Sequence, residues 1–190
     1  MIRLDPSTTA LVLIDLQNGI VGMPLSPRSG PDVLVVGKSL AMRFRAAESK
    51  VVLVTVGFAE DYADVLSAPV DQPTRRPPGG MPKEWSELAD GLAQPGDLHI
   101  VKRQWGAFHG TELDLQLRRR GVKTIVLGGI ATNFGVESTA RQAWEHGYAV
   151  VIVEDACATT SAELHEMAVK AIFPRIARVI VSDDLEFGGG

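Results

Sequence analysis

Two charged residues each follow a strongly apolar run and are candidates for acid/base chemistry. Asp15 comes directly after the run Ala10 to Ile14, and Lys102 comes directly after the run Leu98 to Val101. Burial at the end of a strand raises the pKa of a carboxyl group, whereas a nearby cation lowers that pKa and keeps the group charged. The two residues would therefore stabilise each other's charged forms if they met. Two other interpretations stay open, because an aspartate there can cap a turn and a lysine can extend its ammonium group to solvent.

The segment GGIATNFGVESTAR, residues 128 to 141, predicts a strand-to-helix turn that could hold a ligand. It follows the apolar run Thr124 to Leu127, and Gly135 lies where the next helix would begin. Free backbone N–H groups and the positive end of a helix dipole both favour an anion at such a turn. Binding of a negatively charged group is therefore the first function that this turn suggests.

The known signatures of cofactor and metal sites do not fit this sequence. Its glycine-rich segments match neither G-x-G-x-x-G nor G-x-x-x-x-G-K-[ST], so no nucleotide cofactor is predicted. The serine hydrolase elbow G-x-S-x-G is absent as well. No metal site is predicted, because the histidines are scattered without i,i+4 pairing and Cys157 is the single cysteine. These histidines, each expected at the surface or in a structural role, are His99, His109, His146 and His165.

Six short runs rich in β-branched residues alternate with amphipathic stretches, which predicts an α/β fold with a mainly parallel, Rossmann-like sheet. Each run is nearly all apolar, as expected for strands covered on both faces. The runs are Ala10 to Ile14, Val51 to Val56, Leu98 to Val101, Lys123 to Leu127, Ala149 to Val153 and Ala177 to Val181. Helices are expected near Val33 to Ser49, Glu112 to Arg120, Gly135 to His146 and Ala162 to Phe173. Prolines and glycines between Val70 and Asp97 predict a lid or an irregular excursion instead.

The predicted sheet brings the candidate residues together at one edge. In an open parallel sheet the ligand crevice lies beyond the carboxyl ends of the strands, near the point where the strand order reverses. Asp15, Lys102 and the glycine-rich turn all follow strands, and so does the segment Glu154 to Cys157. We therefore expect a small-molecule site at this edge.

Length and composition predict one domain over residues 1–190 and exclude several classes of function. The chain is 45% hydrophobic and 22% charged, with a formal net charge of −4, and this acidity argues against nucleic acid as a partner. No apolar run approaches the ~20 residues that span a bilayer, and no signal-peptide pattern is present at the start, so no membrane association is expected. The lone Cys157 cannot form an internal disulfide, which agrees with a cytoplasmic location.

Three separated motifs resemble those of the isochorismatase-like hydrolases, also called the cysteine hydrolase superfamily. They are Asp15 within Leu13-Ile14-Asp15-Leu16-Gln17-Asn18, Lys102 ahead of Gly110-Thr111-Glu112-Leu113, and Gly129-Ile130-Ala131-Thr132-Asn133. The resemblance covers nearly the whole chain in order. It implies a three-layer α/β/α domain, an Asp, Lys and Cys triad, and a non-proline cis peptide that would join Ile130 to Ala131. It also implies a homo-oligomer, either a dimer or a tetramer.

The sequence departs from this family pattern at the nucleophile. Alignment on the family turn puts Gly135 where the catalytic cysteine would stand, and glycine offers no atom for acyl-enzyme chemistry. The resemblance then implies an isochorismatase-type reaction in which Asp15 is the general acid or base and Lys102 sets the charge balance. Gly135 would leave room beside them and donate a backbone N–H group.

The same resemblance implies the residues that would contact a substrate. Ile130 and Ala131 form the turn, and Ala131 would donate a backbone N–H group, while Trp105 and Phe108 could wall the pocket or belong to the core. Arg75 and Arg76 in the proline-rich excursion could meet a substrate carboxylate.

Two hypotheses follow. The first is a cofactor-free hydrolase of a small carboxylated molecule. The second is a catalytically inactive binding or structural protein on the same scaffold. Retention of both Asp15 and Lys102 favours the first.

Overall fold

The fold is built on a six-stranded sheet in which every strand is parallel to its neighbours. The structure is a computed structural model that describes residues 1–73 and 77–188. The spatial order is β4-β3-β2-β5-β6-β7, so the strand order reverses between β2 and β5. The strands are β2 (Thr9–Ile14), β3 (Lys50–Val56), β4 (Leu98–Lys102), β5 (Thr124–Ile130), β6 (Ala149–Ala158) and β7 (Arg178–Ile180). Each overlaps one of the six predicted runs, and the predicted α/β fold with its parallel sheet is confirmed.

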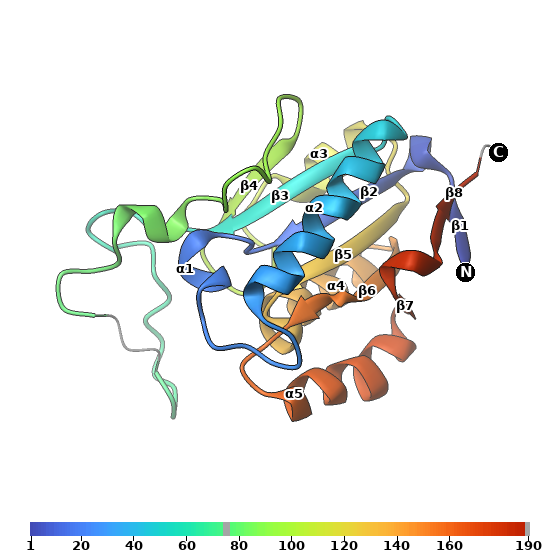
Figure 1. The fold of residues 1–190 in the computed structure, drawn as a ribbon. Coiled ribbons are helices and arrows are strands. Elements are labelled where there is room, and N and C mark those ends of the chain that lie inside the picture. The colour runs from blue at the N-terminus through green and yellow to red at the C-terminus, as the bar shows by residue number, and fades with distance from the viewer. Residues whose placement is uncertain (74–76, 189–190) are drawn as a thin grey trace.

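Helices cover both faces of this sheet. Figure 1 shows α2 in front of the strands and α3 and α4 behind them, which is the expected three-layer arrangement. The α-helices are α1 (Asn18–Val21), α2 (Gly30–Ala46), α3 (Leu113–Arg119), α4 (Glu137–Glu145) and α5 (Ala162–Met167). None of the helices in the described ranges is long and apolar enough to cross a membrane.

The pleat of the central strand divides the core into two halves. Along β2, Ala10, Val12 and Ile14 pack with residues of α3 and α4, whereas Leu11 and Leu13 pack with residues of α2. Successive side chains of a strand point to opposite faces, so a run of apolar residues supplies both halves at once. This is why the strands read as continuous apolar runs.

Helix α2 begins at a capping box. The Ser29 hydroxyl accepts a hydrogen bond from the Asp32 N–H, and the Asp32 carboxylate accepts one from the Ser29 N–H. This exchange satisfies two of the N–H groups that a helix leaves free at its start. The helix therefore starts at Gly30, three residues before the predicted start at Val33, and ends at Ala46.

Strand β5 is longer than predicted and passes through two glycines. The expected strand stopped at Leu127, but β5 continues through Gly128 and Gly129 to Ile130. Gly129 has a φ of 129°, and a Cβ atom there would lie 2.1 Å from the carbonyl oxygen of Ile14 on β2. A side chain is excluded at this position, so the glycine lets the two backbones approach at the point where the ligand crevice is expected.

Strand β6 also extends beyond its predicted end at Val153. Its pairing with β5 shifts after Leu127, so that Gly129 faces Cys157 and the residues between Ile152 and Cys157 bulge out of the ladder. An irregularity of this kind redirects side chains at the end of a sheet. Here it carries Glu154 and Asp155 away from the regular pleat.

A small second sheet was not predicted. Strands β1 (Ile2–Leu4) and β8 (Leu185–Phe187) pair in parallel and bring the two ends of the described chain together (Figure 1). Each strand has three residues, which is too short for a periodic pattern to be recognised.

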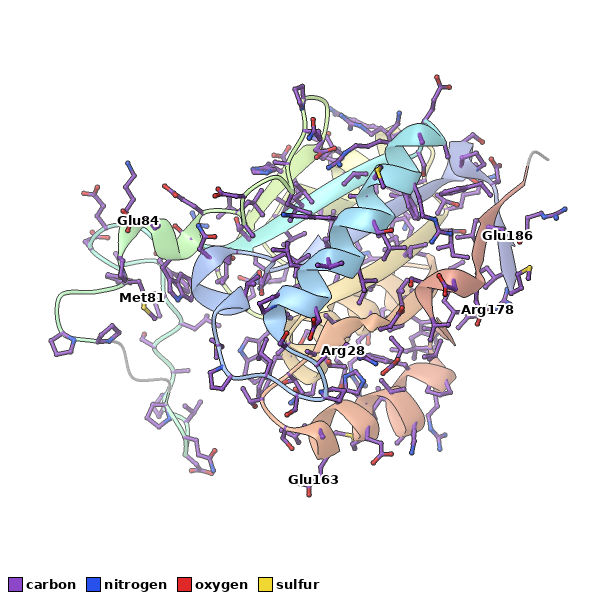
Figure 2. The ribbon with its side chains drawn as sticks, in the orientation of Figure 1. Arg28, Met81, Glu84, Glu163, Arg178 and Glu186 are labelled. Carbon is purple, nitrogen blue, oxygen red and sulfur yellow. The ribbon has the colours of Figure 1, made fainter. Side chains whose placement is uncertain are left out.

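The connection from β3 to β4 contains the irregular excursion. The described part of this connection has one regular element, the 3-10 helix η2 (Lys83–Ser86). Figure 2 places Met81 and Glu84 on this segment, which extends away from the body of the molecule. The excursion starts soon after β3 ends at Val56, which is earlier than the predicted start at Val70. The chain returns to the core at the buried residues Ala89 and Leu92.

Candidate active site

Asp15 and Lys102 meet in a buried ion pair at the carboxyl edge of the sheet. The Lys102 Nζ lies 2.7 Å from the Asp15 Oδ2, and the two side chains are 2% and 7% exposed. Lys102 also donates a hydrogen bond of 3.1 Å to the carbonyl oxygen of Gln104. The predicted convergence of these two residues, which are separated by 87 positions, is therefore present in the structure.

Backbone geometry aims the two side chains at each other. Lys102 and Ile100 are two positions apart on β4, so their side chains point to the same face of the sheet. Ile100 packs in the half of the core that contains residues of α3 and α4. A regular strand would point Asp15 to the opposite face from Ile14. Instead Asp15 has a φ of 55°, in the left-handed region that aspartate tolerates better than most residues. Because Asp15 has this left-handed conformation, the chain leaves the regular pleat there and the Asp15 carboxylate points to the same side as Lys102.

The electrostatic environment leaves Asp15 close to its titration point at neutral pH. Burial raises the pKa of Asp15 to about 6, although the charge of Lys102 and its hydrogen bond act to lower it. The second carboxylate oxygen, Oδ1, is buried and makes no hydrogen bond within the described part of the chain. Asp15 can therefore hold or release a proton near pH 6, and one of its oxygens keeps its hydrogen-bonding capacity.

Gln17 fixes the neighbouring strand next to this pair, a role that the sequence pattern did not reveal. Its side-chain amide accepts a hydrogen bond from the Val56 N–H and donates one to the Val56 carbonyl oxygen, at 2.9 and 3.1 Å. The same amide donates to the carbonyl oxygen of Trp85 at 3.3 Å. The Gln17 side chain thus bonds to the backbone of β3 as a neighbouring strand would, although β2 has already ended. Its bond to Trp85 also links the end of the excursion to β3.

The turn after β5 brings Gly135 next to Asp15. The peptide bond between Ile130 and Ala131 is cis, as the family resemblance implies. Residues Thr132–Val136 form a single π-helical turn, η3, which leads into α4. A Cβ atom built on Gly135 would lie 3.3 Å from the Asp15 Oδ2. The structure therefore places Gly135, which has no reactive side chain, directly beside the ion pair.

Hydrogen bonds hold the start of α4 against the segment that follows Lys102. The Thr139 hydroxyl donates to the Gly135 carbonyl oxygen at 2.7 Å and accepts from the Ala107 N–H at 3.1 Å. The Gln142 side chain, one turn further along, accepts from the Phe108 N–H. These contacts fix the position of Gly135 relative to the ion pair.

The two aromatic residues expected to wall the pocket lie in different surroundings. Trp105 is 61% exposed and contacts the ring of Phe134, with ring centroids 4.7 Å apart. Phe108 is buried and contacts the rings of His146 and Tyr148. His146 lies at the end of α4 remote from Gly135, so Phe108 takes the core position that the sequence left open.

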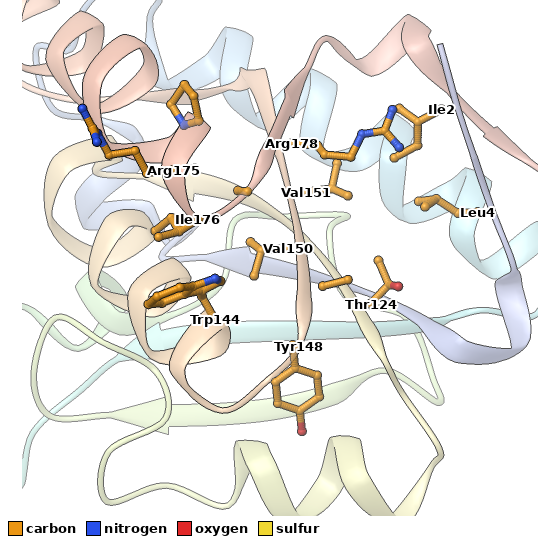
Figure 3. Close-up of a pocket in the computed structure, with 13 residues that line it drawn as sticks. Ile2, Leu4, Thr124, Trp144, Tyr148, Val150, Val151, Arg175, Ile176 and Arg178 are labelled. Carbon is orange, nitrogen blue, oxygen red and sulfur yellow. The ribbon is translucent and has the colours of Figure 1, made fainter.

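Two hollows lie at opposite edges of the sheet. One, of about 510 Å³, is lined by residues at the beginnings of β5 and β6 with Trp144 and Arg178 (Figure 3). The other, of about 340 Å³, is lined by residues that follow β3, including Phe58, Tyr62 and Trp85. Parallel strands begin at one edge of the sheet and end at the other. Of these two hollows, the second therefore lies at the same edge as Asp15 and Lys102, although neither residue lines it.

A partly buried polar chain flanks the turn on the side of α5, with Thr132 and His165 buried and Glu154 and Arg28 half-buried. The Thr132 hydroxyl lies 2.8 Å from the His165 Nδ1, and the His165 Nε2 lies 2.8 Å from the Glu154 Oε1. Arg28 donates hydrogen bonds to both carboxylate oxygens of Glu154, at 2.8 and 3.0 Å. These four residues come from four separate segments, so no spacing in the sequence could have grouped them.

The remaining candidates do not join the ion pair. Cys157 is fully buried, and burial raises the pKa of its thiol to about 12, which suits a packed and inert cysteine. No cluster of metal-ligating side chains is found within residues 1–73 and 77–188. Arg75 and Arg76, the proposed contacts to a substrate carboxylate, lie outside the described residues.

Comparisons with known proteins agree with this geometry. The isochorismatase domain family matches residues 9–184. The isochorismatase family protein YecD of Escherichia coli O157:H7 is 52% identical over 180 residues, covering 94% of this chain and 95% of its own. A solved isochorismatase family structure from Burkholderia thailandensis aligns with a TM-score of 0.91 at 48% identity, covering 96% of this chain and 95% of that one. The ureidoacrylate amidohydrolase RutB of Methylorubrum extorquens is 31% identical over 179 residues, which is 82% of this chain and 71% of its own.

The parallel sheet covered by helices on both faces, together with these matches, defines a hydrolase of the α/β class. The chain belongs to the isochorismatase family.

Proposed function

We propose that this hydrolase acts on a small carboxylated molecule by acid/base chemistry, with Asp15 as the proton donor and Lys102 as its charge partner. One observation carries the proposal: a buried carboxyl group with a pKa of about 6 lies 2.7 Å from a buried ammonium group, beside a residue with no side chain. A carboxyl group whose pKa lies near the working pH is suited to general acid catalysis.

The most concrete reaction is hydrolysis of a vinyl ether, as in isochorismate. Protonated Asp15 would transfer its proton to the terminal carbon of the vinyl group, which leaves a positive charge on the ether carbon. Water would then attack that carbon and lose a proton to the ionised Asp15. The resulting hemiketal breaks down to pyruvate and a dihydroxylated ring acid. Lys102 would offset the negative charge that Asp15 carries between these two proton transfers.

A covalent acyl-enzyme route has less support. We place Gly135 where the family resemblance puts the nucleophilic cysteine, and the protein's single thiol, Cys157, is fully buried. RutB is named as an amidohydrolase, but an amide substrate would find no activated thiolate beside Asp15 in this chain. Hydrolysis by acid/base chemistry needs no such nucleophile.

The site would bind its substrate between the turn and the end of β3. The backbone N–H groups of Ala131 and Gly135 would face a negatively charged oxygen, and Trp105 would cover one side of the ring. The hollow of about 340 Å³ beyond β3 would take the remainder of the molecule. Two carboxylates on the substrate would suit the cationic Lys102 and a helix start.

We further propose that the protein is a cytoplasmic homo-oligomer. Leu66 and Val70 on the excursion are 76% and 62% exposed, and apolar side chains of this kind on a projecting segment suit contact with a second copy. Sedimentation of the purified protein tests this directly, with a dimer or a tetramer as the expected result and a monomer at micromolar concentration as the contrary one.

The reaction is tested by offering isochorismate to the purified protein and following pyruvate release. The parent protein should turn over the substrate, and Asp15→Asn should lose at least about a hundredfold in kcat, because removal of a general acid typically costs 10²–10⁴. Absence of turnover by the parent protein would remove the vinyl ether reaction. Equal turnover by both proteins would remove the role of Asp15.

A further inference from the structure

The partly buried chain Thr132–His165–Glu154–Arg28 is a second polar cluster that the proposed acid/base chemistry does not use. It runs from the turn after β5 through α5 to the bulge of β6 and ends in the segment before α2. Thr132 is fully buried and His165 is 4% exposed. Buried polar groups are costly unless they are hydrogen-bonded, so such a chain tends to fix the elements that it joins.

The hydrogen bonds assign the protons on His165. Burial acts to raise the pKa of Glu154, but the hydrogen bonds from Arg28 and His165 and the charge of Arg28 outweigh it and hold that pKa below its usual value. An ionised carboxylate can only accept, so the His165 Nε2 carries the proton that is donated to Glu154. In the tautomer with its proton on Nε2 alone, the Nδ1 accepts the hydrogen bond of the Thr132 hydroxyl, 2.8 Å away.

A hydroxyl, an imidazole and a carboxylate in this order have the connectivity of a hydrolase nucleophile and its base. Burial decides against that role here. The Thr132 side chain is 0% exposed, so no substrate can reach its oxygen. What the chain can do is hold the turn that Thr132 belongs to.

Arg28 anchors the other end of the chain. Its guanidinium group donates to the backbone carbonyl oxygens of Glu154 and Cys157, at 3.0 and 2.9 Å, as well as to the Glu154 carboxylate. These carbonyls lie in the bulge where β6 leaves its ladder with β5. Arg28 therefore ties the carboxylate of Glu154 to the backbone of the bulge.

Thr132 is well placed to transmit this anchoring to the site. It is the first residue of the π-helical turn η3, and Gly135 is the fourth. Within the turn, the N–H groups of Phe134 and Val136 both donate to the carbonyl oxygen of Ala131 at 3.1 Å. Asn133 is held separately, because its side-chain oxygen accepts from the Thr159 hydroxyl. Movement of Thr132 would therefore displace the segment that lies against Asp15.

We propose that His165 is a positioning residue that, through its acceptor Nδ1 and the Thr132 hydroxyl, holds the turn from Ala131 to Gly135 against the Asp15–Lys102 pair. The effect on turnover rests on the proposed function, whereas the effect on the turn does not. His165 contacts no reacting atom, so its loss acts only through misplacement of the turn, which also contacts the substrate, and lowers kcat/KM.

Two substitutions separate the two hydrogen bonds of the ring. In His165→Asn the side-chain oxygen takes the place of Nδ1 and can still accept from Thr132, but the bond to Glu154 is lost. In His165→Gln the side-chain amide can still donate to Glu154, but the bond to Thr132 is lost. Thr132→Val and Thr132→Ser form a second pair, because the first removes the hydroxyl at nearly constant shape and the second keeps it.

Steady-state kinetics and amide hydrogen exchange of residues 131–136 are measured on all four variants. His165→Gln and Thr132→Val should lose at least about tenfold in kcat/KM, since small misplacements of a site cost up to 10². Their turn amides should exchange at least about tenfold faster. Thr132→Ser should remain close to the parent protein in both measurements, and His165→Asn, which keeps the bond to Thr132 but loses the anchor at Glu154, should fall between the parent protein and His165→Gln.

Equal behaviour of His165→Asn and His165→Gln in kcat/KM and in exchange would overturn the proposal, because it requires the variant that keeps the bond to Thr132 to hold the turn better than the variant that loses it. If the parent protein has no turnover, the exchange measurement alone decides. Faster exchange in His165→Gln than in His165→Asn, and in Thr132→Val than in Thr132→Ser, would then support the positioning role even though the proposed reaction had failed.

Discussion

Asp15 combines two environments that act against each other on one carboxyl group. Burial disfavours its charged form, and Lys102 at 2.7 Å favours it. Burial dominates, so the pKa rises from 3.8 to about 6. The convergence of the two residues could be predicted from the sequence, because each follows an apolar strand in a parallel sheet. The sequence could not predict which influence dominates, since that depends on how completely the surrounding residues exclude water.

The first prediction concerns the pH dependence of kcat/KM. If protonated Asp15 is the acid, activity should be constant well below pH 6 and should fall about tenfold per pH unit above it, as the proton is lost. Lys102→Met removes a cation that lowers the pKa of Asp15, so the falling limb should move to higher pH. Activity that rises through pH 6 would instead identify Asp15 as a base.

The second prediction concerns thiol reactivity. Cys157 in the native parent protein should resist iodoacetamide at pH 8, because burial raises the pKa of its thiol to about 12. Gly135→Cys should add one thiol that reacts faster than Cys157, since the start of a helix and the ammonium group of Lys102 favour its thiolate, while the Asp15 carboxylate, 3.3 Å from the Cβ position, limits the gain. Mass spectrometry of the alkylated peptides distinguishes the two cysteines. Preferential labelling of Cys157 would contradict the assigned environments.

At the scale of elements, the carboxyl ends of the strands are shaped by two glycines in β5 and by the side chain of Gln17. Sequence periodicity located the strands, and the rule for parallel sheets located the crevice. Sequence periodicity did not predict the extension of β5 through Gly128 and Gly129, because two glycines after an apolar run normally indicate a turn. Nor could it predict that Gln17 would pair with the backbone of Val56, because that contact joins residues 39 positions apart.

The third prediction tests Gln17. Gln17→Ala leaves the N–H and the carbonyl group of Val56 without their partner, and each unsatisfied buried group costs about 1–3 kcal/mol. The free energy of unfolding, measured with urea, should fall by about 2–4 kcal/mol on this basis. Gln94→Ala is the matched control, because Gln94 is exposed and its truncation should change stability by less than about 0.5 kcal/mol. Equal effects of the two substitutions would refute the role given to Gln17.

The fourth prediction tests the close approach of β5 to β2. Gly129→Ala combines a φ of 129° with a Cβ atom 2.1 Å from the Ile14 carbonyl oxygen, so it should cost about 3 kcal/mol or more, or prevent folding. Gly110→Ala is the control, because Gly110 has a φ of 67° but no atom within 4 Å of its Cβ position. Its cost should be limited to about 1–2 kcal/mol. A smaller loss for Gly129→Ala than for Gly110→Ala would contradict the packing described here.

At the scale of the whole molecule, the strand order determines where chemistry can occur. The order reverses between β2 and β5, and Asp15 and the glycine-rich turn follow these two strands. The sequence therefore located the acid/base pair and the turn but not the cluster around His165, whose members lie on four separate segments. The excursion after β3 was recognised only by its prolines and glycines, because it has no periodic pattern to interpret.

The central claim is that Asp15 and Lys102 act as one unit, and a double-mutant cycle tests it most directly. We would measure kcat/KM for pyruvate release from isochorismate with the parent protein, Asp15→Asn, Lys102→Met and the double variant, after confirming by circular dichroism that each is folded. The double variant should be no less active than the more impaired single variant, because groups that act as a unit give strongly non-additive losses. Losses that simply multiply would show that the two residues act independently and would contradict the proposed site.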